Sequence, residues 1–190
     1  MTPVSPVIPM KIDDELRLEP LEPLHAGSLF DLVDQDRDRL GHWLPWVART
    51  LTAEDSLAFI EDSKRRRDLD SGGNGSGDWA IVVDAAGSAR TVGVIGLHDS
   101  SPANRRIAIG YWVSGDHTGN GYITRAARAV TVRCIEAGFH RVEIRARTDN
   151  ARSRAVAERL GFEFEGVMRA AEWIDETPFD HAVFARIATP

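Results

Sequence analysis

The stretch that decides the fold lies in the second half of the chain and reads IGYWVSGDHTGNGYIT over residues 109–124. Alternating apolar residues at its start predict a strand, and helical spacing from Ile123 predicts a helix that ends near Gly138. Between them, Gly119 and Gly121 would let the backbone approach a ligand closely. Unpaired N–H groups and the dipole at a helix start favour an anion, so the segment is a candidate phosphate site. On the glycines alone, a plain strand-to-helix turn is the favoured alternative.

The segments on either side predict strands and helices in an order without regular alternation. Period-two patterns and runs bounded by turn residues predict strands near residues 16–21, 78–84, 91–98, 107–113, 142–146, 163–173 and 180–187. Helical spacing and capping residues predict helices over residues 29–40, from Thr52 to the charged stretch at 64–67, from Ile123, and over 151–160. This order predicts an α+β domain, with a mixed, mostly antiparallel sheet of about seven strands flanked by about four helices.

The composition fits one globular domain of 190 residues, 43% apolar and 27% charged. A net charge of −6 excludes a nucleic-acid footprint over the whole surface, although the arginines of residues 125–169 are numerous enough for a local basic patch. Three prolines in the first nine residues predict a loose arm over residues 1–12, before a single domain over 13–190. One cysteine, no long apolar run and no signal-peptide pattern predict a soluble cytoplasmic protein without membrane or nucleic-acid partners.

A second informative segment reads TDNARSRAVAERLGF over residues 148–162. Asp149 or Asn150 is placed to cap a helix that Gly161 stops, and this structural interpretation is adequate by itself. Ser153 falls in the first turn of that helix, where it is either an ordinary helix residue or part of a site.

Together the two segments resemble the GCN5-related N-acetyltransferase (GNAT) superfamily. In that family a strand–loop–helix holds the coenzyme A pyrophosphate, and an Asn-x-x-Ser/Ala helix entry ended by Leu-Gly-Phe flanks the pantetheine arm. The resemblance includes GHWLPW at 41–46, TAEDS at 52–56 and IGYW at 109–112, and it continues to Glu172. These motifs are similar to the RimJ/RimL-type branch, which acetylates the N-termini of ribosomal proteins. The resemblance covers nearly all of the chain after residue 12.

The phosphate loop departs from the family pattern Gln/Arg-x-x-Gly-x-Gly/Ala, because residues 118–123 read TGNGYI. The first position lacks the long polar side chain, and the last position carries isoleucine. Neither change removes the backbone N–H groups that would bind phosphate, so coenzyme A is still the predicted cofactor. No role is expected for the Thr118 side chain.

The resemblance implies a GNAT fold whose sheet is splayed between its fourth and fifth strands, with acetyl-CoA as the cofactor. It implies that Glu172 is the general base and that Ser153 meets the departing sulfur. The fallback bases are Asp175, Glu176 and Asp180. The oxyanion donor is expected among the backbone N–H groups of residues 112–114. The cofactor-binding residues that it implies are Trp112, Val113, Ser114, His117, Thr118, Gly119, Asn120, Gly121, Tyr122, Ile123, Thr124, Asn150 and Ser153.

Trp43, Trp46 and Tyr111 are the candidate acceptor-binding residues, although large aromatics in such places are often partial core. Tyr111 and Trp112 alternate along their strand, so one should face the cofactor and the other the core. Cys134 is expected to be buried filler, and the histidines show no metal-binding spacing, so no metal is predicted. His181 is a weaker candidate for the acceptor end.

The expected activity is direct transfer of acetyl from acetyl-CoA to a primary amine, with a protein N-terminal α-amine as the preferred acceptor and a ribosomal protein as the partner that the resemblance implies. The open alternatives are acetyl or succinyl transfer to a small-molecule amine (polyamine, amino sugar or amino acid), a non-catalytic CoA-binding regulatory protein, and a nucleotide-phosphate binder. Dimers are common in the branch that the chain resembles, so a homodimer is a further expectation.

Overall fold

The computed structural model describes residues 5–68, 74–85 and 87–189. Within these residues the strands form one eight-stranded sheet, ordered β1-β2-β3-β4-β5-β6-β8-β7. The bounds of the strands are β1 (Met10–Lys11), β2 (Leu16–Pro20), β3 (Asp78–Ala85), β4 (Ser88–Ser101), β5 (Arg106–Val113), β6 (Arg141–Arg147), β7 (Glu163–Ile174) and β8 (Thr177–Ile187). Neighbouring strands are antiparallel except β5 and β6. The α+β prediction is confirmed, and β1 is the strand that the sequence pattern missed.

The sheet splays between β5 and β6, the fourth and fifth of the predicted strands. Residues 106–109 of β5 pair in parallel with residues 141–144 of β6. Beyond that point β5 continues along β4, whereas the end of β6 continues along β8. The predicted splay is therefore confirmed, and the gap opens where residues 110–113 leave β6.

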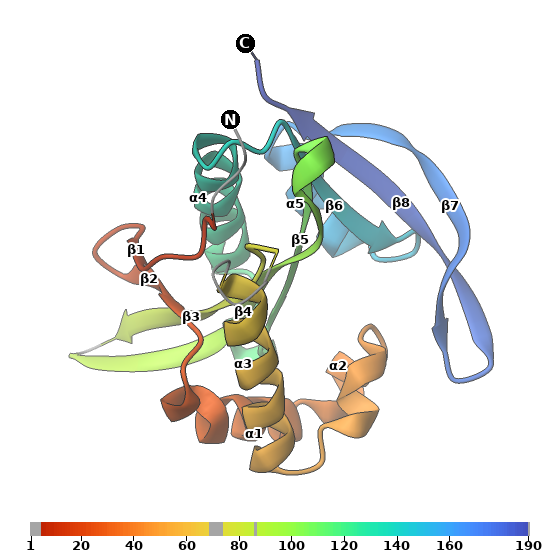
Figure 1. The fold of residues 1–190 in the computed structure, drawn as a ribbon. Helices are drawn as coiled ribbons and strands as arrows, with labels where there is room; N and C mark the ends of the chain where they lie inside the picture. The colour runs from red at the N-terminus through yellow and green to blue at the C-terminus, as the bar shows by residue number, and fades with distance from the viewer. Residues whose placement is uncertain (1–4, 69–73, 86, 190) are drawn as a thin grey trace.

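Helices cover both faces of the sheet (Figure 1). Their bounds are α1 (Ala26–Gln35), α2 (Arg37–Gly41), α3 (Ala53–Arg67), α4 (Tyr122–Glu136) and α5 (Ala151–Arg159). The larger core cluster joins the sheet to α4 and α5, and a second cluster of Leu29, Ile60 and Val94 joins α1 and α3 to the opposite face. None of the helices in the described ranges has the length and apolar character to cross a membrane.

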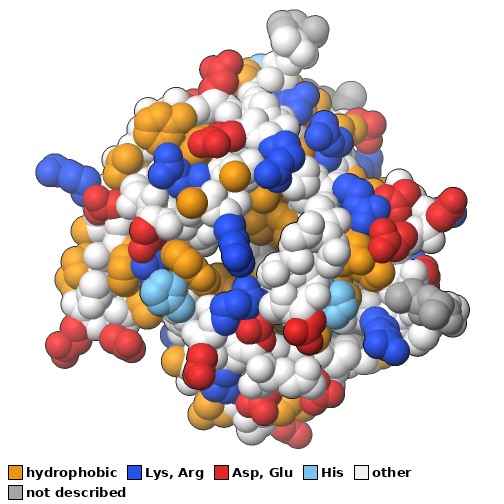
Figure 2. All heavy atoms as spheres, turned by 180° about the vertical axis from the view of Figure 1, so that it is seen from behind, with side chains coloured by type: hydrophobic (Ala, Val, Ile, Leu, Met, Phe, Trp, Pro, Cys, Tyr) orange, Lys and Arg blue, Asp and Glu red, His pale blue; other side chains and the backbone are white. Residues whose placement is uncertain are grey.

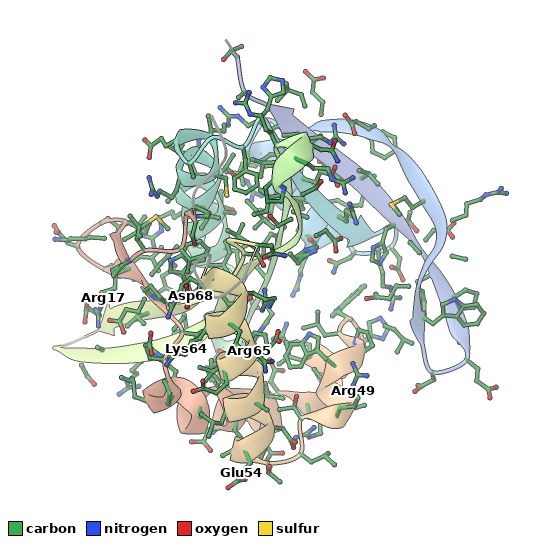
Figure 3. All side chains as sticks on the ribbon, viewed as in Figure 1. Arg17, Arg49, Glu54, Lys64, Arg65 and Asp68 are labelled. Carbon is green, nitrogen blue, oxygen red and sulfur yellow. The ribbon has the colours of Figure 1, made fainter. Side chains whose placement is uncertain are left out.

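The helix predicted over residues 29–40 is in fact two helices, α1 and α2, because the backbone leaves helical geometry at Asp36 (φ −125°). The helix predicted from Thr52 is confirmed as α3. Its start is fixed by a capping box in which the Asp55 N–H donates to Thr52 Oγ1 and the Asp55 carboxylate accepts from the Thr52 N–H at 2.9 Å. Figure 3 shows Glu54 at the first turn of α3 and Lys64 and Arg65 at the opposite end, as the helix dipole favours.

Two arginines of β6, Arg141 and Arg145, are paired with carboxylates. Arg141 donates to Glu143 at 2.7 Å and also binds Glu165. Arg145 binds the same Glu143 at 2.6 Å and Asp99 at 2.7 Å. Basic and acidic side chains are likewise interspersed on the face seen in Figure 2.

The expectation of a loose arm over residues 1–12 is corrected for its described part, which packs against the sheet. Val7 is only 6% exposed and joins the main core cluster. The Trp79 indole N–H donates to the Ile8 carbonyl at 2.7 Å, and Met10–Lys11 form β1. The apolar Val7 and the buried indole donor of Trp79 account for this docking, since both gain a partner from it. Residues 1–4 of the predicted arm lie outside the described residues.

A buried ion pair joins α3 to β3. Arg66 Nη2 lies 2.7 Å from Asp78 Oδ2, and the Asp78 N–H donates to Ser63 Oγ at 2.8 Å. Burial raises the pKa of the Asp78 carboxyl, an effect that Arg66 opposes. Gly96 is the register partner of Asp78 on β4, and a Cβ at Gly96 would lie 1.7 Å from Asp78 Oδ1. Glycine at 96 is therefore what leaves room for the pair.

We expect Gly96→Ala to lower the free energy of unfolding by about 2 kcal/mol or more, because the methyl group must displace the buried carboxylate from Arg66. Urea denaturation measures the change. Gly27→Ala is the matched control: Gly27 is in the first turn of α1, where a Cβ meets no described atom within 4 Å. That change should be neutral or stabilise by up to ~1 kcal/mol. Equal unfolding midpoints for the two variants would contradict the packing argument.

Candidate active site

The loop from β5 to α4 presents backbone donors. Gly119 and Gly121 have φ of +84° and +73°, the left-handed region that favours glycine, and Gly121 is the N-cap of α4. A Cβ built at either glycine meets no described atom within 4 Å, so the chain leaves open space there. The first N–H groups of α4 lack intrahelical partners, and its first turn carries no carboxylate. This helix start fits an anionic group such as a pyrophosphate.

The polar side chains that precede the glycines shape the loop. Thr118 Oγ1 donates to the Gly115 carbonyl at 2.9 Å, so its hydroxyl proton is used within the loop. His117 Nδ1 lies 2.8 Å from Ser114 Oγ, so these two predicted cofactor residues contact each other. Asn120 is exposed at the tip of the loop.

The predicted cofactor residues at the start of α4 have structural side chains. The ring of Tyr122 is buried, and its hydroxyl donates to Glu15 at 2.9 Å. Ile123 packs against the main core cluster. Thr124 Oγ1 accepts from Arg159 of α5 at 3.0 Å. What this turn can offer to a ligand is therefore mainly its backbone N–H groups.

The start of the loop is held by two residues that sequence reasoning missed as site residues, Asp36 and Arg39. The Asp36 carboxylate accepts the Gly115 N–H at 2.7 Å, and it is also bonded by Arg39 Nε at 2.9 Å. Arg39 Nη2 donates to the Val113 carbonyl at 2.7 Å. The available signal was that Asp36 occupies a position of helical spacing that is otherwise apolar.

The backbone of β5 narrows the choice of oxyanion donor. The Ser114 N–H donates to the Val92 carbonyl of β4 at 2.9 Å, so it is already used. The register with β4 is unbroken from 93↔113 to 98↔108. Because N–H directions alternate along a strand, Trp112 also points to β4, whereas Tyr111 and Val113 point into the splay. Of the three predicted residues, Val113 alone presents its N–H to the gap.

Ser153 lies beside the splay in the first turn of α5. Asn150 is the N-cap of that helix, and its Oδ1 accepts the Ser153 N–H at 3.0 Å. The Tyr111 hydroxyl reaches across from β5 and lies 3.1 Å from Ser153 Oγ and 3.3 Å from the Ser153 carbonyl. Burial raises the pKa of Tyr111 to about 12. Tyr111 thus joins the two sides of the gap at Ser153.

Glu172 lies on β7 beside His181 of β8, with Glu172 Oε2 3.3 Å from His181 Nε2. The Glu172 side chain is 26% exposed, so it is open to solvent or a ligand. His181 is the register partner of Arg147, the last residue of β6, and the chain runs from there through Asn150 to α5. Glu172 and His181 therefore lie at the carboxyl end of β6, the strand from which the chain runs on to Ser153 in the first turn of α5.

A β-bulge precedes Glu172 and is held by one of the fallback bases. The register of β7 and β8 shifts between Met168 and Glu172, and Ala170 in the bulge has φ +48°. The Asp180 carboxylate accepts the Ala170 N–H at 2.8 Å. Asp180 therefore fixes the bulge that aims Glu172, whereas Asp175 and Glu176 lie in the exposed turn of the hairpin.

Trp43 is engaged by a buried arginine at the end of β6. The Arg147 guanidinium carbon lies 4.8 Å from the Trp43 ring centroid and 3.5 Å from that of Phe179. Arg147 Nη1 donates to the His42 carbonyl at 2.8 Å, and Nη2 binds Asp149 at 2.6 Å. This stack fastens the α2 segment and the β7–β8 hairpin to β6, which explains the position of Trp43 without a substrate.

A cavity of about 530 Å³ lies between the sheet and the helices α1 and α3. Trp46 and Trp112 line it with ring centroids 5.9 Å apart, together with apolar residues of α1 such as Leu29 and Val33. Tyr111 also lines this cavity, and its hydroxyl lies 3.1 Å from Ser153 Oγ. The roles predicted for Trp112 at the cofactor and Tyr111 at the acceptor stay predictions.

A splayed sheet whose gap leads to a glycine-lined helix start is the arrangement of an acyl-CoA-dependent N-acyltransferase. Residues 15–163 match the family model of the acetyltransferase (GNAT) domain, and the chain belongs to that family. It is an acetyltransferase that uses acetyl-CoA, of the RimJ/RimL-type branch.

Similar proteins support this assignment. The chain is 33% identical to YdaF of Bacillus subtilis (strain 168), whose name assigns it provisionally to the ribosomal N-acetyltransferases, over 87% of each chain. It is 27% identical to the ribosomal-protein-serine acetyltransferase of Escherichia coli (strain K12), over 94% of this chain and 96% of that protein. The crystal structure of the microcin C7 self-immunity acetyltransferase MccE, in complex with acetyl-CoA and AMP, has a TM-score of 0.86 and 26% identity, and covers 94% of this chain and 96% of MccE.

We expect Gly121→Val to raise the dissociation constant for coenzyme A at least tenfold, because a β-branched residue resists a φ of +73° and its side chain would fill the ligand's approach. Isothermal titration with coenzyme A measures the affinity. The matched control is Gly87→Val in the β3–β4 connection, where φ is also positive (+79°) and a Cβ meets no described atom within 4 Å. Unchanged affinity in the Gly121 variant would exclude this loop as the pyrophosphate site.

Proposed function

We propose that this enzyme transfers acetyl from acetyl-CoA directly to the α-amine of a protein N-terminus, with a ribosomal protein as the acceptor class. The observation that carries the proposal is the Glu172–His181 contact at the carboxyl end of β6, the strand that leads to Ser153 in the first turn of α5. A general base and a hydroxyl donor suit an amine that attacks a carbonyl. The names of the E. coli and B. subtilis relatives support the acceptor class.

Each residue of the site has a proposed part in this reaction. Acetyl-CoA supplies the acetyl thioester when it is bound. The N–H groups at residues 119–124 hold its pyrophosphate, and the splay receives the pantetheine arm beside Asn150. The Val113 N–H faces the gap and stabilises negative charge on the carbonyl oxygen. Ser153 Oγ donates a hydrogen bond to the departing sulfur.

Glu172 is the proposed general base, acting directly or through a water molecule. A free α-amine has a pKa of ~8, against ~10.4 for lysine. At a given pH, a larger fraction of N-terminal amines than of lysine side chains is already deprotonated, so an N-terminal acceptor depends less on the base. A solvent-accessible carboxylate beside His181 is sufficient for that task, which favours the N-terminal acceptor over lysine.

A second candidate acceptor is a small-molecule amine, and the cavity of about 530 Å³ favours it. A pocket of this size lined by Trp46 and Trp112 suits a bulky flat or apolar group. MccE, to which the chain is similar, was crystallised with AMP as well as acetyl-CoA.

Thiol release from acetyl-CoA across a panel of acceptors tests the proposal. The panel holds peptides with serine, alanine and acidic N-termini, N-terminally blocked peptides with one lysine, polyamines, amino sugars and aminoacyl nucleotides. We expect release with the free N-terminal peptides above all others. Release with a small amine alone would favour the second candidate. Thiol release that occurs only with succinyl-CoA would identify a succinyl donor in place of acetyl. Coenzyme A binding without thiol release under any condition would favour a non-catalytic protein.

We expect Glu172→Gln to lower kcat about a hundredfold, because the amide cannot accept the amine proton. The affinity for coenzyme A should stay within twofold, since Glu172 lies on the hairpin and not on the phosphate loop. Steady-state kinetics and titration measure the two effects. Glu176→Gln in the exposed hairpin turn is the comparison: a loss there and none at Glu172 would transfer the role of base to Glu176.

A further inference from the structure

We infer that Tyr111 is a positioning residue that holds the Ser153 hydroxyl with its proton directed at the departing sulfur. This inference rests on the proposed function of Ser153. It gives the tyrosine of β5 a part in the chemistry, although its hydroxyl reaches the site from the opposite side of the splay.

The hydrogen bonds around Ser153 leave few arrangements for its hydroxyl proton. The Ser153 N–H is committed to Asn150 Oδ1 at 3.0 Å, which fixes the first turn of α5. The Ser153 carbonyl is an acceptor for the helix hydrogen bond of α5. Ser153 Oγ lies 3.1 Å from the Tyr111 hydroxyl, a shorter contact than the 3.3 Å to the carbonyl. The direction of the hydrogen bond between the two hydroxyls can be either, because each oxygen can donate to the other.

Two arrangements are open to this pair. In one, Ser153 donates to Tyr111, whose proton goes to the Ser153 carbonyl, and no proton is left for a ligand. In the other, Tyr111 donates to Ser153 Oγ, and the serine proton is free to turn to a third group. The 3.1 Å contact between the two hydroxyls is common to both arrangements, because either oxygen can be its donor. A thiolate that accepts the serine proton in a hydrogen bond favours the second arrangement, since donation and acceptance at one hydroxyl reinforce each other.

Tyr111 keeps its own proton throughout. Burial raises the pKa of Tyr111 to about 12, well above the ~8.5 of a thiol, so the phenol does not give its proton to a thiolate. In the transfer step the bond between the amine nitrogen and the carbonyl carbon forms, and the carbon–sulfur bond breaks. Sulfur takes the bonding electron pair and leaves as thiolate, and the amine proton passes to the base. Tyr111 and Ser153 contribute hydrogen bonds, with no net proton transfer.

A double-mutant cycle on Tyr111→Phe and Ser153→Ala tests this coupling. We expect each single variant to lower kcat about tenfold, and the double variant to lose no more than either single one, because both changes remove the same hydrogen bond to sulfur. The KM for acetyl-CoA should stay within twofold. The matched control is Thr131→Val, which removes a buried hydroxyl bonded within α4 at 2.7 Å and should leave kcat unchanged.

The outcomes separate this inference from the proposed function. A hundredfold loss in the double variant, or normal kcat in Tyr111→Phe with a loss in Ser153→Ala, would overturn the coupling alone. Normal kcat in Ser153→Ala would remove Ser153 from the mechanism, and the inference would fall with it.

A second measurement distinguishes positioning from acid catalysis and does not depend on folding of the phenylalanine variant. Replacement of Tyr111 by 3-fluorotyrosine keeps the ring and the hydroxyl but makes the phenol more acidic. For a positioning residue we expect kcat and its pH profile to stay within twofold of the unmodified enzyme. A kcat that rises steeply with phenol acidity would make Tyr111 the acid and overturn the inference.

Discussion

The rest of the structure depends on the point where β5 and β6 stop pairing. Parallel pairing ends at 109↔144, so the backbone groups on one edge of residues 110–113 face a gap inside the molecule. Unpaired N–H and C=O groups at such an edge cost free energy unless each finds a hydrogen-bond partner. Here the Tyr111 hydroxyl also meets Ser153 Oγ at 3.1 Å, and the same interruption supplies backbone donors and the space for a ligand. A continuous sheet would remove both.

Three contacts keep the two halves of the sheet in register across this gap. Tyr111 reaches from β5 to Ser153 of α5. Arg147, between the rings of Trp43 and Phe179, joins the end of β6 to the α2 segment and to the β7–β8 hairpin. Asp36 and Arg39 hold the turn after β5. The gap is thus bordered by side-chain contacts on several sides.

Local features of the sequence predicted the elements, because periodicity and capping act over a few residues. The Thr52 cap is local and appears where expected, and Asn150 is the cap of the two residues that the sequence offered, Asp149 and Asn150. The splay and the branch came from the resemblance of separated motifs, since spacing alone did not indicate them.

Long-range contacts account for what the sequence did not predict. Asp36 meets Gly115 across 79 residues, and Arg147 meets His42 across 105 residues, distances at which periodicity carries no information. The docking of Val7 and Ile8 depends in the same way on Trp79, far along the chain. The alternation of Tyr111 and Trp112 was visible in the sequence, but which of them faced Ser153 depended on how α5 packs.

The Asp36 contact has a thermodynamic consequence. A single carboxylate at the junction of α1 and α2 fixes Gly115 in the loop that leads to the α4 helix start, so these helices and this loop share one hydrogen-bonded unit. Binding free energies through a shared unit are reciprocal: whatever factor an acceptor imposes on coenzyme affinity through this contact, the coenzyme imposes on acceptor affinity. The size of any such coupling between the two substrates would then depend in part on one hydrogen bond of 2.7 Å.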